Sequence, residues 1–211
     1  MAVKRVTRIE QSAGNRERVL AAARSVFTRK GFHAASVDEI AEEAGFSKGV
    51  VYSQFGGKDD LFLALLERRI EQRRRENLET VRRATEANVL AALFEAAQRD
   101  TRSDQAWTLL VLEFRLHAAR DPELLQRYAA LHERTVAGIA EAIAAMCEKM
   151  GAHPSFTPDE LARFIIAVDN GSVLELLTAP RAFTSRVAQA ATQYVIESTG
   201  TTDGRTRGGT R

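Results

Sequence analysis

The stretch SVDEIAEEAGFSKGVVYSQFGGK, residues 36–58, contains the signals for two short helices separated by a tight turn. Ser36 and Glu39 have the S-x-x-E spacing of a capping box, in which each side chain accepts a hydrogen bond from the other residue's backbone N–H. Apolar residues then recur at helical spacing as far as Gly45, which supplies the positive φ that ends a helix. The stretch therefore predicts a first helix that starts at about Val37 and ends at Gly45.

A second helix is expected from Lys48 to about Phe55, with Ser47 as its N-cap. Because a helix this short is not stable alone, Val51 and Phe55 should pack it against the rest of the chain. The opposite face carries small and polar side chains, the kind of surface with which an α-helix enters the major groove of DNA. The residues of this face are Lys48, Gly49, Tyr52 and Ser53.

A preceding helix is predicted from about Asn15 to Lys30, where an apolar stripe recurs at helical spacing and Gly31 follows. A short reading helix needs such a platform to hold it at a fixed angle. Residues 14–58 are therefore expected to form a three-helix DNA-binding head with a helix-turn-helix.

The distribution of charge agrees with a head that binds nucleic acid. Residues 1–58 contain ten Lys and Arg against six Asp and Glu, a net charge of +4, whereas residues 59–197 contain seventeen against twenty-one, a net charge of −4. Residues 1–13 are polar and basic and are expected to form a flexible arm. A frayed terminus and an arm that reaches the minor groove both remain open.

Composition points to an all-helical protein that is long enough to bury a sizeable core. The chain has 211 residues and only four prolines, all of them from Pro122 to Pro180, and no alternation of apolar and polar residues predicts a strand. The single cysteine excludes an intramolecular disulfide framework. Since neither a run of 18 apolar residues nor a secretory signal is present, we expect a cytoplasmic protein without a membrane partner.

Two patterns in the head match a known family. The first is A-x-x-x-F-x-x-x-G-F over residues 23–32, and the second is S-V-x-x-I-A-x-x-A-G-F-S-K-G-x-x-Y-x-x-F-x-x-K-x-x-L over residues 36–61. Together they closely resemble the DNA-binding head of the TetR (tetracycline repressor) family of transcriptional regulators. The resemblance implies an all-helical homodimer whose C-terminal body binds a small-molecule effector, which loosens the protein from its operator.

The resemblance also assigns roles to single positions of the head. It places Gly49 and Val50 nearest the bases. The family commonly has His where this chain has Gln54, so the phosphate contact of that histidine does not carry over, and the neighbouring Ser53 stays a candidate contact. The positions that the resemblance assigns to phosphate contacts are Ser36, Ser47, Lys48, Tyr52 and Lys58.

Residues 59–197 are expected to form a helical ligand-binding and dimerisation body, and residues 198–211, which lack apolar side chains, a disordered tail. In the first body helix, spacings such as those from Glu71 to Arg74 and to Arg75 predict ion pairs within one solvated face. The body helices are predicted at about 59–84, 85–98, 103–120, 121–150, 157–178 and 181–197.

The penultimate predicted helix contains LARFIIAVDNGSVLELL, residues 161–177, and is apolar nearly all round. Such a helix must be buried on more than one side, yet only one helix follows it. Pairing the last two helices with their copies in a second subunit would close this surface as an isologous four-helix bundle. The sequence therefore predicts a homodimer that presents two reading helices to a pseudo-palindromic double-stranded DNA operator.

A ligand site is predicted where polar groups interrupt apolar helices of the body. A concave apolar cavity with a few polar groups suits a small hydrophobic or aromatic molecule. The same pattern is typical of an ordinary core, and Asn170 is also compatible with a dimer seam. The candidates are Trp107, Leu110, Phe114, His117, Tyr128, His132 and Asn170.

No catalytic constellation is recognisable in the chain. Glu113 and His117 lie at i,i+4 spacing and His132 could join them on a metal, but there is no H-E-x-x-H motif and no Cys cluster. We expect a buried, inert thiol at Cys147, and neither enzyme activity nor a metal nor another cofactor. The favoured function is thus an effector-released repressor. The alternative is a dimeric DNA-binding regulator without an effector, controlled by its abundance or by a protein partner.

Overall fold

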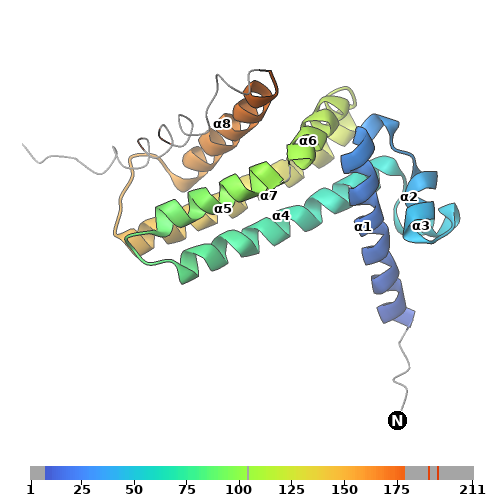
Figure 1. Ribbon diagram of the computed structural model, residues 1–211, viewed down its shortest axis with the longest axis horizontal. Helices are drawn as coiled ribbons and strands as arrows, with labels where there is room; N and C mark the ends of the chain where they lie inside the picture. Colours follow the sequence, from blue (N-terminus) through green and yellow to red (C-terminus); the bar gives the residue numbers. More distant parts are fainter. Residues whose placement is uncertain (1–7, 104, 179–189, 191–193, 195–211) are drawn as a thin grey trace, which may run out of the picture. The chain divides into compact units, whose positions relative to one another are not determined.

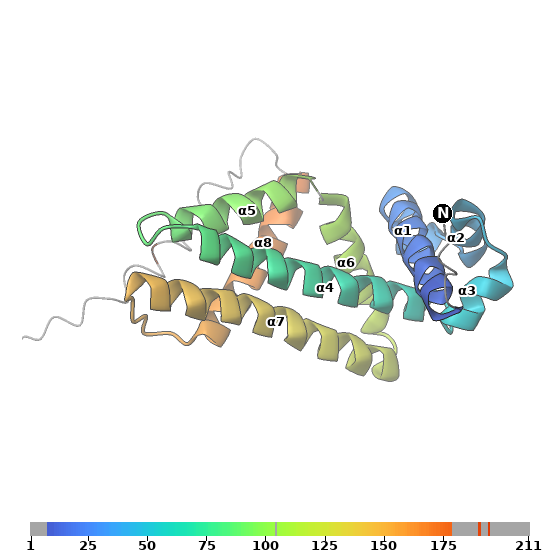
Figure 2. The ribbon, with the colours of Figure 1, turned by 90° about the horizontal axis from the view of Figure 1, so that it is seen from below.

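The computed structural model describes residues 8–103 and 105–178 together with Ala190 and Tyr194 (Figures 1 and 2). Every regular element from 8–103 and 105–178 is a helix, which confirms the prediction of an all-α protein with a helix-turn-helix head. The helices are α1 (Arg8–Ala34), α2 (Val37–Ala44), α3 (Lys48–Gln54), α4 (Lys58–Arg83), α5 (Val89–Ser103), α6 (Gln105–Ala118), α7 (Pro122–Met150) and α8 (Pro158–Thr178).

Helix α1 is longer than predicted at both ends. It already begins at Arg8, so the predicted start at about Asn15 was too late; residues 1–7 lie outside the described part, and the flexible arm over residues 1–13 stays a prediction. Adding a turn to an existing helix gains one backbone hydrogen bond per residue and needs no new nucleus. Gly31 interrupts the helix with φ 78° and ψ 170°, but helical structure resumes as far as Ala34.

The turn between α2 and α3 forms as the sequence predicts. The Ser36 hydroxyl accepts the Glu39 N–H at 3.2 Å while the Glu39 carboxylate accepts the Ser36 N–H at 3.2 Å, so the capping box is complete. Gly45 has φ 73°, and the N–H of Phe46 donates to the carbonyl of Ala41 at 2.9 Å. These bonds close both ends of α2 and fix the direction in which α3 begins.

The chain divides into two compact units. The first comprises Met1–Arg73 and Thr101–Arg134, and therefore contains α1, α2, α3 and α6 with parts of α4 and α7. The second comprises Arg74–Asp100 and Thr135–Arg211. The first unit thus adds further helices to the head, and the functional division expected after residue 58 stays a prediction.

Aromatic rings fill the core of the first unit. Phe62 of α4 stacks on Phe114 of α6 with ring centroids 4.1 Å apart, and Phe32 of α1 meets Phe114 edge-on at 4.9 Å. Phe27 and Trp107 also lie beside Phe62, at 5.8 and 6.0 Å, and all five side chains are buried. Because α6 supplies two of these rings, α1 packs on α6 as well as on α4.

The second unit has a smaller, aliphatic core. Cys147 is buried in it, and burial raises the pKa of its thiol, in agreement with the inert thiol that the sequence predicts. Eight buried residues form this cluster: Val81, Val89, Val136, Ile143, Met146, Cys147, Leu161 and Ala162. Eight more are only partly buried against it: Ala84, Leu90, Leu93, Ile139, Ala140, Ala145, Ile165 and Ile166.

Charged residues of α4 reach other helices, which the spacing within α4 does not predict. In the second unit, Arg74 binds Glu141 of α7 through two hydrogen bonds of 2.6 and 2.8 Å. In the first unit, Glu67 pairs with Arg134 of α7. A long charged side chain on a helix that packs against a neighbour can pair with a residue of that neighbour as well as with one a turn away. Spacing of i,i+4 within one helix therefore does not identify all possible ion-pair partners.

The remaining helices agree with the predicted order. Pro122 opens α7 and Pro158 opens α8, as expected for proline in the first turn. Helix α5 begins four residues later than predicted, at Val89, because Thr85 and Asn88 form a turn in which the Thr85 N–H donates to the Asn88 side chain at 2.8 Å. The predicted last helix, 181–197, and the tail after it lie outside the ranges that the structure describes continuously.

Candidate nucleic-acid interface

Helix α3 is held in place by its buried side and by an arginine of α1. Val51 and Phe55 are 1% and 4% exposed, as the sequence predicts. The Arg16 guanidinium lies 4.3 Å from the Phe55 ring centroid and donates to the carbonyl of Gln54 at 3.2 Å. A cation at the C-terminal end of α3 also suits the negative end of the helix dipole. The orientation of α3 therefore depends on α1.

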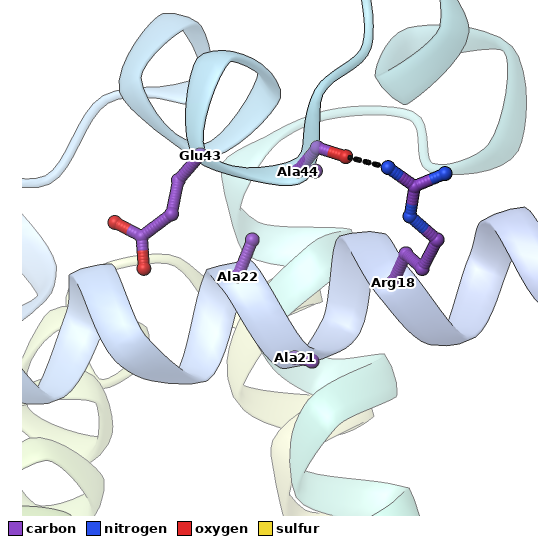
Figure 3. Close-up of a pocket in the computed structure, with 5 residues that line it drawn as sticks. All are labelled: Arg18, Ala21, Ala22, Glu43 and Ala44. Atoms are coloured by element: carbon purple, nitrogen blue, oxygen red, sulfur yellow. Dashed lines mark hydrogen bonds between the residues drawn. The ribbon is translucent and has the colours of Figure 1, made fainter.

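A second arginine of α1 holds the end of α2. The Arg18 guanidinium donates to the carbonyl of Ala44 at 3.0 Å, as Figure 3 shows, and lies 4.6 Å from the Phe46 ring. An open depression of about 360 Å³ lies here between α1 and α2. Glu43 at its rim pairs with Arg29 at 2.8 Å. The depression is lined by Arg18, Ala21, Ala22, Glu43 and Ala44.

The other face of α3 is exposed, and three of its residues make it suitable for close approach. Ser47 precedes α3 without a side-chain capping bond. A Cβ added at Gly49 would meet only the Ser47 hydroxyl, at 3.9 Å, so the fold itself does not require glycine there. Tyr52 is 46% exposed. A surface with small and polar side chains, one of which has a hydroxyl that does not cap the helix, can approach a DNA groove.

Lys48 lies on this exposed face and pairs with Asp38 of α2. Its ammonium is 2.7 Å from the Asp38 carboxylate and 5.9 Å from the Tyr52 ring centroid. The hydrogen bond to Asp38, and the charge of that carboxylate, raise the pKa of Lys48, which favours its charged form. Both partners are largely exposed, so the pair is a weak surface interaction that a phosphate group could replace.

Two of the predicted contact residues use their hydroxyl groups inside the head. The Ser36 hydroxyl donates to the Glu39 carboxylate at 3.1 Å and also accepts the Glu39 N–H. The Ser53 hydroxyl donates to the carbonyl of Val50 at 2.8 Å. Neither serine therefore has a free hydroxyl proton for a phosphate oxygen, although both residues are exposed.

Lys58 binds the end of α1 and the segment that follows it. Its ammonium donates to the carbonyls of His33 and Ala35, each at 3.2 Å, and lies 4.6 Å from the Phe32 ring centroid. These are the partners of a residue that holds the head together, and no sequence pattern predicted them. The lysine has three N–H groups, so two of them are already committed to the protein.

Gln54 lies where the TetR family, which the head resembles, commonly has histidine. Among the described residues, its side-chain oxygen is buried without a hydrogen-bond partner. Sequence reasoning missed Asp38, Arg16 and Arg18 as parts of this interface. Only the two arginines could have been suspected, because they are basic residues just before the apolar stripe of the predicted first helix. Their targets are backbone carbonyls, which no sequence pattern identifies.

The predicted ligand residues are divided between the two units. Trp107, Leu110, Phe114 and Tyr128 are buried in the core of the first unit, and burial raises the pKa of the Tyr128 hydroxyl. In the same unit, His117 lies 3.1 Å from the Asp59 carboxylate and His132 stacks on Tyr128 with ring centroids 6.4 Å apart. Asn170 belongs to the second unit. The structure thus favours the core interpretation for the four buried residues.

From 8–103 and 105–178, no group of three or more His, Cys, Asp and Glu side chains is arranged to hold a metal ion. None of the helices in these ranges is long and apolar enough to cross a membrane.

The geometry of α2, the turn and α3 agrees with comparisons to known proteins. Residues 19–65 match the model described as bacterial regulatory proteins of the tetR family, and residues 86–200 match the model of the C-terminal part of BetI-type transcriptional repressors. The second match alone covers more than half of the chain. The chain belongs to the TetR family of transcriptional regulators.

Relatives of this TetR-family chain fall into two groups. The transcriptional activator FasR of Mycolicibacterium smegmatis is 48% identical over 56 residues, which cover 26% of each chain. The regulator BetI of Brucella canis is 30% identical over 138 residues, which cover 61% of this chain and 68% of BetI. The match to the first relative therefore spans about a quarter of its length, whereas that to BetI is more extensive.

The fold of the TetR-family chain is similar to that of solved regulators. The FadR regulator of Bacillus subtilis, crystallised with stearoyl-CoA, superposes with a TM-score of 0.67 over 86% of this chain and 97% of FadR. The identity is only 17%, so this likeness concerns the fold. The all-helical fold that the sequence predicts is thus one already seen in a solved transcriptional regulator.

Proposed function

We propose that this chain is a homodimeric repressor that acts in the cytoplasm, binds a pseudo-palindromic DNA operator through α3 and leaves it when a small hydrophobic or aromatic effector binds. The observation that carries this proposal is the exposed face of α3, held in place by buried residues on its other side. We assign the chain no catalytic activity, metal or other cofactor. The direct DNA contacts that we propose are Ser47, Lys48, Gly49, Val50 and Tyr52.

Ser36, Ser53 and Lys58 have a supporting role in this proposal. Their polar groups already bind Glu39, Val50 and the end of α1, respectively. Each of these bonds fixes one end of a helix that carries or positions a direct contact. The backbone and side chains of the head are therefore organised before DNA arrives, which reduces the entropy that binding must overcome.

Exposed apolar side chains on α8 support a dimer. Phe164, Leu174 and Leu177 are 36%, 50% and 49% exposed in the single chain. A second copy of the same helix would cover them by two-fold symmetry, and the fold would then present two copies of α3 to two half-sites of DNA. Sedimentation at micromolar concentration tests this, since a monomer would contradict it.

Replacing Tyr52 with alanine is expected to weaken DNA binding about tenfold, because one hydrogen-bonding ring is lost from each subunit of the dimer. The melting temperature should hardly change, since Tyr52 lies on the surface. The measurement is a gel-shift titration with a duplex that the unaltered protein selects from a random library. Tyr52→Phe separates the hydroxyl from the ring, and Phe156→Ala, at 48% exposure in a loop, is the matched control. Equal affinities for Tyr52→Ala and Phe156→Ala would remove Tyr52 from the interface.

The second unit supports an apolar effector. Leu90, Leu93, Ile139, Ile165 and Ile166 are only partly buried there, so apolar surface remains that a hydrophobic molecule would cover. FadR, which resembles this chain in fold, was crystallised with stearoyl-CoA, whose acyl chain is of that chemistry. The aliphatic character of the unit favours such ligands over polar ones.

A bound effector is expected to raise the melting temperature. At a ligand concentration of about 100 Kd the native state gains about 2.7 kcal/mol, which corresponds to roughly 5–10 °C for a chain of this size. The measurement is thermal unfolding with a panel of acyl and aromatic compounds, with sugars as hydrophilic controls.

The burial of Trp107, Leu110, Phe114 and Tyr128 favours the second candidate, a regulator without an effector. That candidate would be preferred if no compound of the panel raised the melting temperature.

A further inference from the structure

The segment that joins α1 to α2 decides where the helix-turn-helix lies. Gly31, with φ 78°, breaks the path of α1, and Ser36 caps α2 only five residues later. Between them Phe32 is 1% exposed in the aromatic core. Any movement of this short segment would therefore move the start of α2, and with it the turn and α3.

Glu113 of α6 binds the backbone of this segment. One carboxylate oxygen accepts the N–H of Phe32 at 2.9 Å and the other accepts the N–H of His33 at 3.1 Å. A Cβ at Gly31 would lie only 2.8 Å from the first of these oxygens, so glycine also gives the carboxylate room to approach. Hydrogen bonds to an ionised acceptor are stronger than those between neutral groups.

Lys58 binds the backbone carbonyl groups of the same segment, whereas Glu113 binds its N–H groups. Its ammonium donates to the carbonyls of His33 and Ala35, while Glu113 accepts the amides of Phe32 and His33. The anion thus takes N–H groups and the cation takes C=O groups. Helix α6 lies beside α1 in the first unit (Figure 1), and Lys58 is the first residue of α4, so α4 and α6 together hold the backbone of Phe32, His33 and Ala35.

We propose that Glu113 and Lys58 form a charge clamp on residues 31–36 and act as positioning residues for DNA binding. This inference rests on the proposed function, because the clamp matters for binding only if α3 reads DNA. The residues themselves need not touch DNA. Their effect is to keep α2 and α3 at one angle to α1, so that Lys48 and Tyr52 reach their targets together.

The clamp gives Lys58 a role that differs measurably from a phosphate contact. A lysine that neutralises a phosphate releases a counterion, so its loss reduces the slope of log K against log salt by about one per contact. A lysine that only holds the protein backbone leaves this slope unchanged while lowering affinity at every salt concentration. The salt dependence of binding therefore distinguishes the two roles.

The test compares Glu113→Gln, Lys58→Met and the double variant with the unaltered protein. Glutamine keeps the size of Glu113 but places an NH₂ group against one of the two N–H donors. Glu123→Gln is the matched control, since Glu123 is exposed at the start of α7 in the same unit. The readouts are affinity for a duplex selected from a random library by the unaltered protein, from 50 to 200 mM salt, and the exchange rates of the Phe32 and His33 amides.

Each single variant is expected to weaken binding about fivefold with an unchanged salt slope. The double variant should lose less than the product of the two, since the residues act on one segment. The amides of Phe32 and His33 should exchange faster in Glu113→Gln, and Lys58→Arg, which keeps a donor cation, should recover most of the affinity. If Glu113→Gln fails to fold, Glu113→Asp provides the same comparison at smaller perturbation, and if Lys58→Met fails to fold, Lys58→Gln, which also removes the cation, takes its place.

Several results would overturn the clamp. A lower salt slope in Lys58→Met would make Lys58 a phosphate contact, and unaltered amide exchange in Glu113→Gln would show that its bonds do not hold the segment. Affinity losses that simply multiply in the double variant would show two independent roles. If instead the unaltered protein selects no duplex, the proposed function fails, while amide exchange still reports on the clamp by itself.

Discussion

Replacing Phe62 with alanine is expected to lower the free energy of unfolding by about 3–5 kcal/mol. The side chain is fully buried, and its ring contacts four others, on Phe27, Phe32, Trp107 and Phe114. The neighbours come from α1 and α6 and are themselves held by backbone, so they cannot collapse into the space that a phenyl ring leaves. The variant should therefore lose both the transfer free energy of the ring and the contacts across the cavity.

Urea denaturation at a fixed protein concentration measures this loss. Trp107 is the single tryptophan of the chain and lies 6.0 Å from Phe62, so its fluorescence reports on the same core. Phe156→Ala removes the same side chain from an exposed loop position and should change the free energy of unfolding by less than about 0.5 kcal/mol. A loss below about 1 kcal/mol in Phe62→Ala would mean that the aromatic cluster repacks, contrary to the tight stacking described above.

Local signals were sufficient to predict the helix-turn-helix. The capping box of Ser36 and Glu39, the left-handed Gly45 and the apolar spacing to Phe55 each depend on residues within a few positions of one another. These interactions depend on the geometry of the α-helix and its ends, which is the same in all proteins. A short sequence motif is therefore enough to predict them. The start of α1 is polar and contains no apolar stripe or capping motif, so the helix was predicted to begin too late.

Contacts between distant residues could not be predicted. Glu113 and Phe32 are 81 positions apart, and nothing in the sequence around Glu113 marks it as an acceptor for backbone amides. Lys58 is similar, because a lysine at a helix start is equally compatible with solvent, phosphate or carbonyl partners. Choosing among these partners requires the angle between α1, α4 and α6, which arises from the packing of all their side chains.

The ligand residues illustrate a different limit. An apolar stripe interrupted by a polar group is common to a packed core and to a pocket wall, because both are apolar surfaces removed from water. Trp107, Leu110 and Phe114 have this pattern and lie in the core. Periodicity identifies which face of a helix is buried, but it does not indicate whether the neighbour is protein or ligand.

Reversing the charge of Lys48, as Lys48→Glu, is expected to weaken DNA binding about 100-fold at low salt. Each subunit of the proposed dimer would lose a cation and gain an anion on the face of α3, beside Asp38, and both anions would then face phosphates. The cost to folding should be small, below about 1 kcal/mol, because the Lys48 pair is exposed. The loss of affinity should shrink as salt rises, since it is electrostatic in origin.

Replacing Asp38 with asparagine should have the opposite effect, because Lys48 is then no longer shared between a carboxylate and a phosphate. We expect affinity to rise about threefold at low salt, and the Lys48→Glu loss to be somewhat smaller in the double variant, where one of the two adjacent anions is absent. Gel-shift titrations of a selected duplex across salt concentrations measure both effects. Arg120→Glu, after α6, changes the net charge by the same amount away from α3 and controls for the overall field. If Arg120→Glu weakened binding as much as Lys48→Glu, the effect would belong to net charge, and Lys48 would lose its place at the DNA interface.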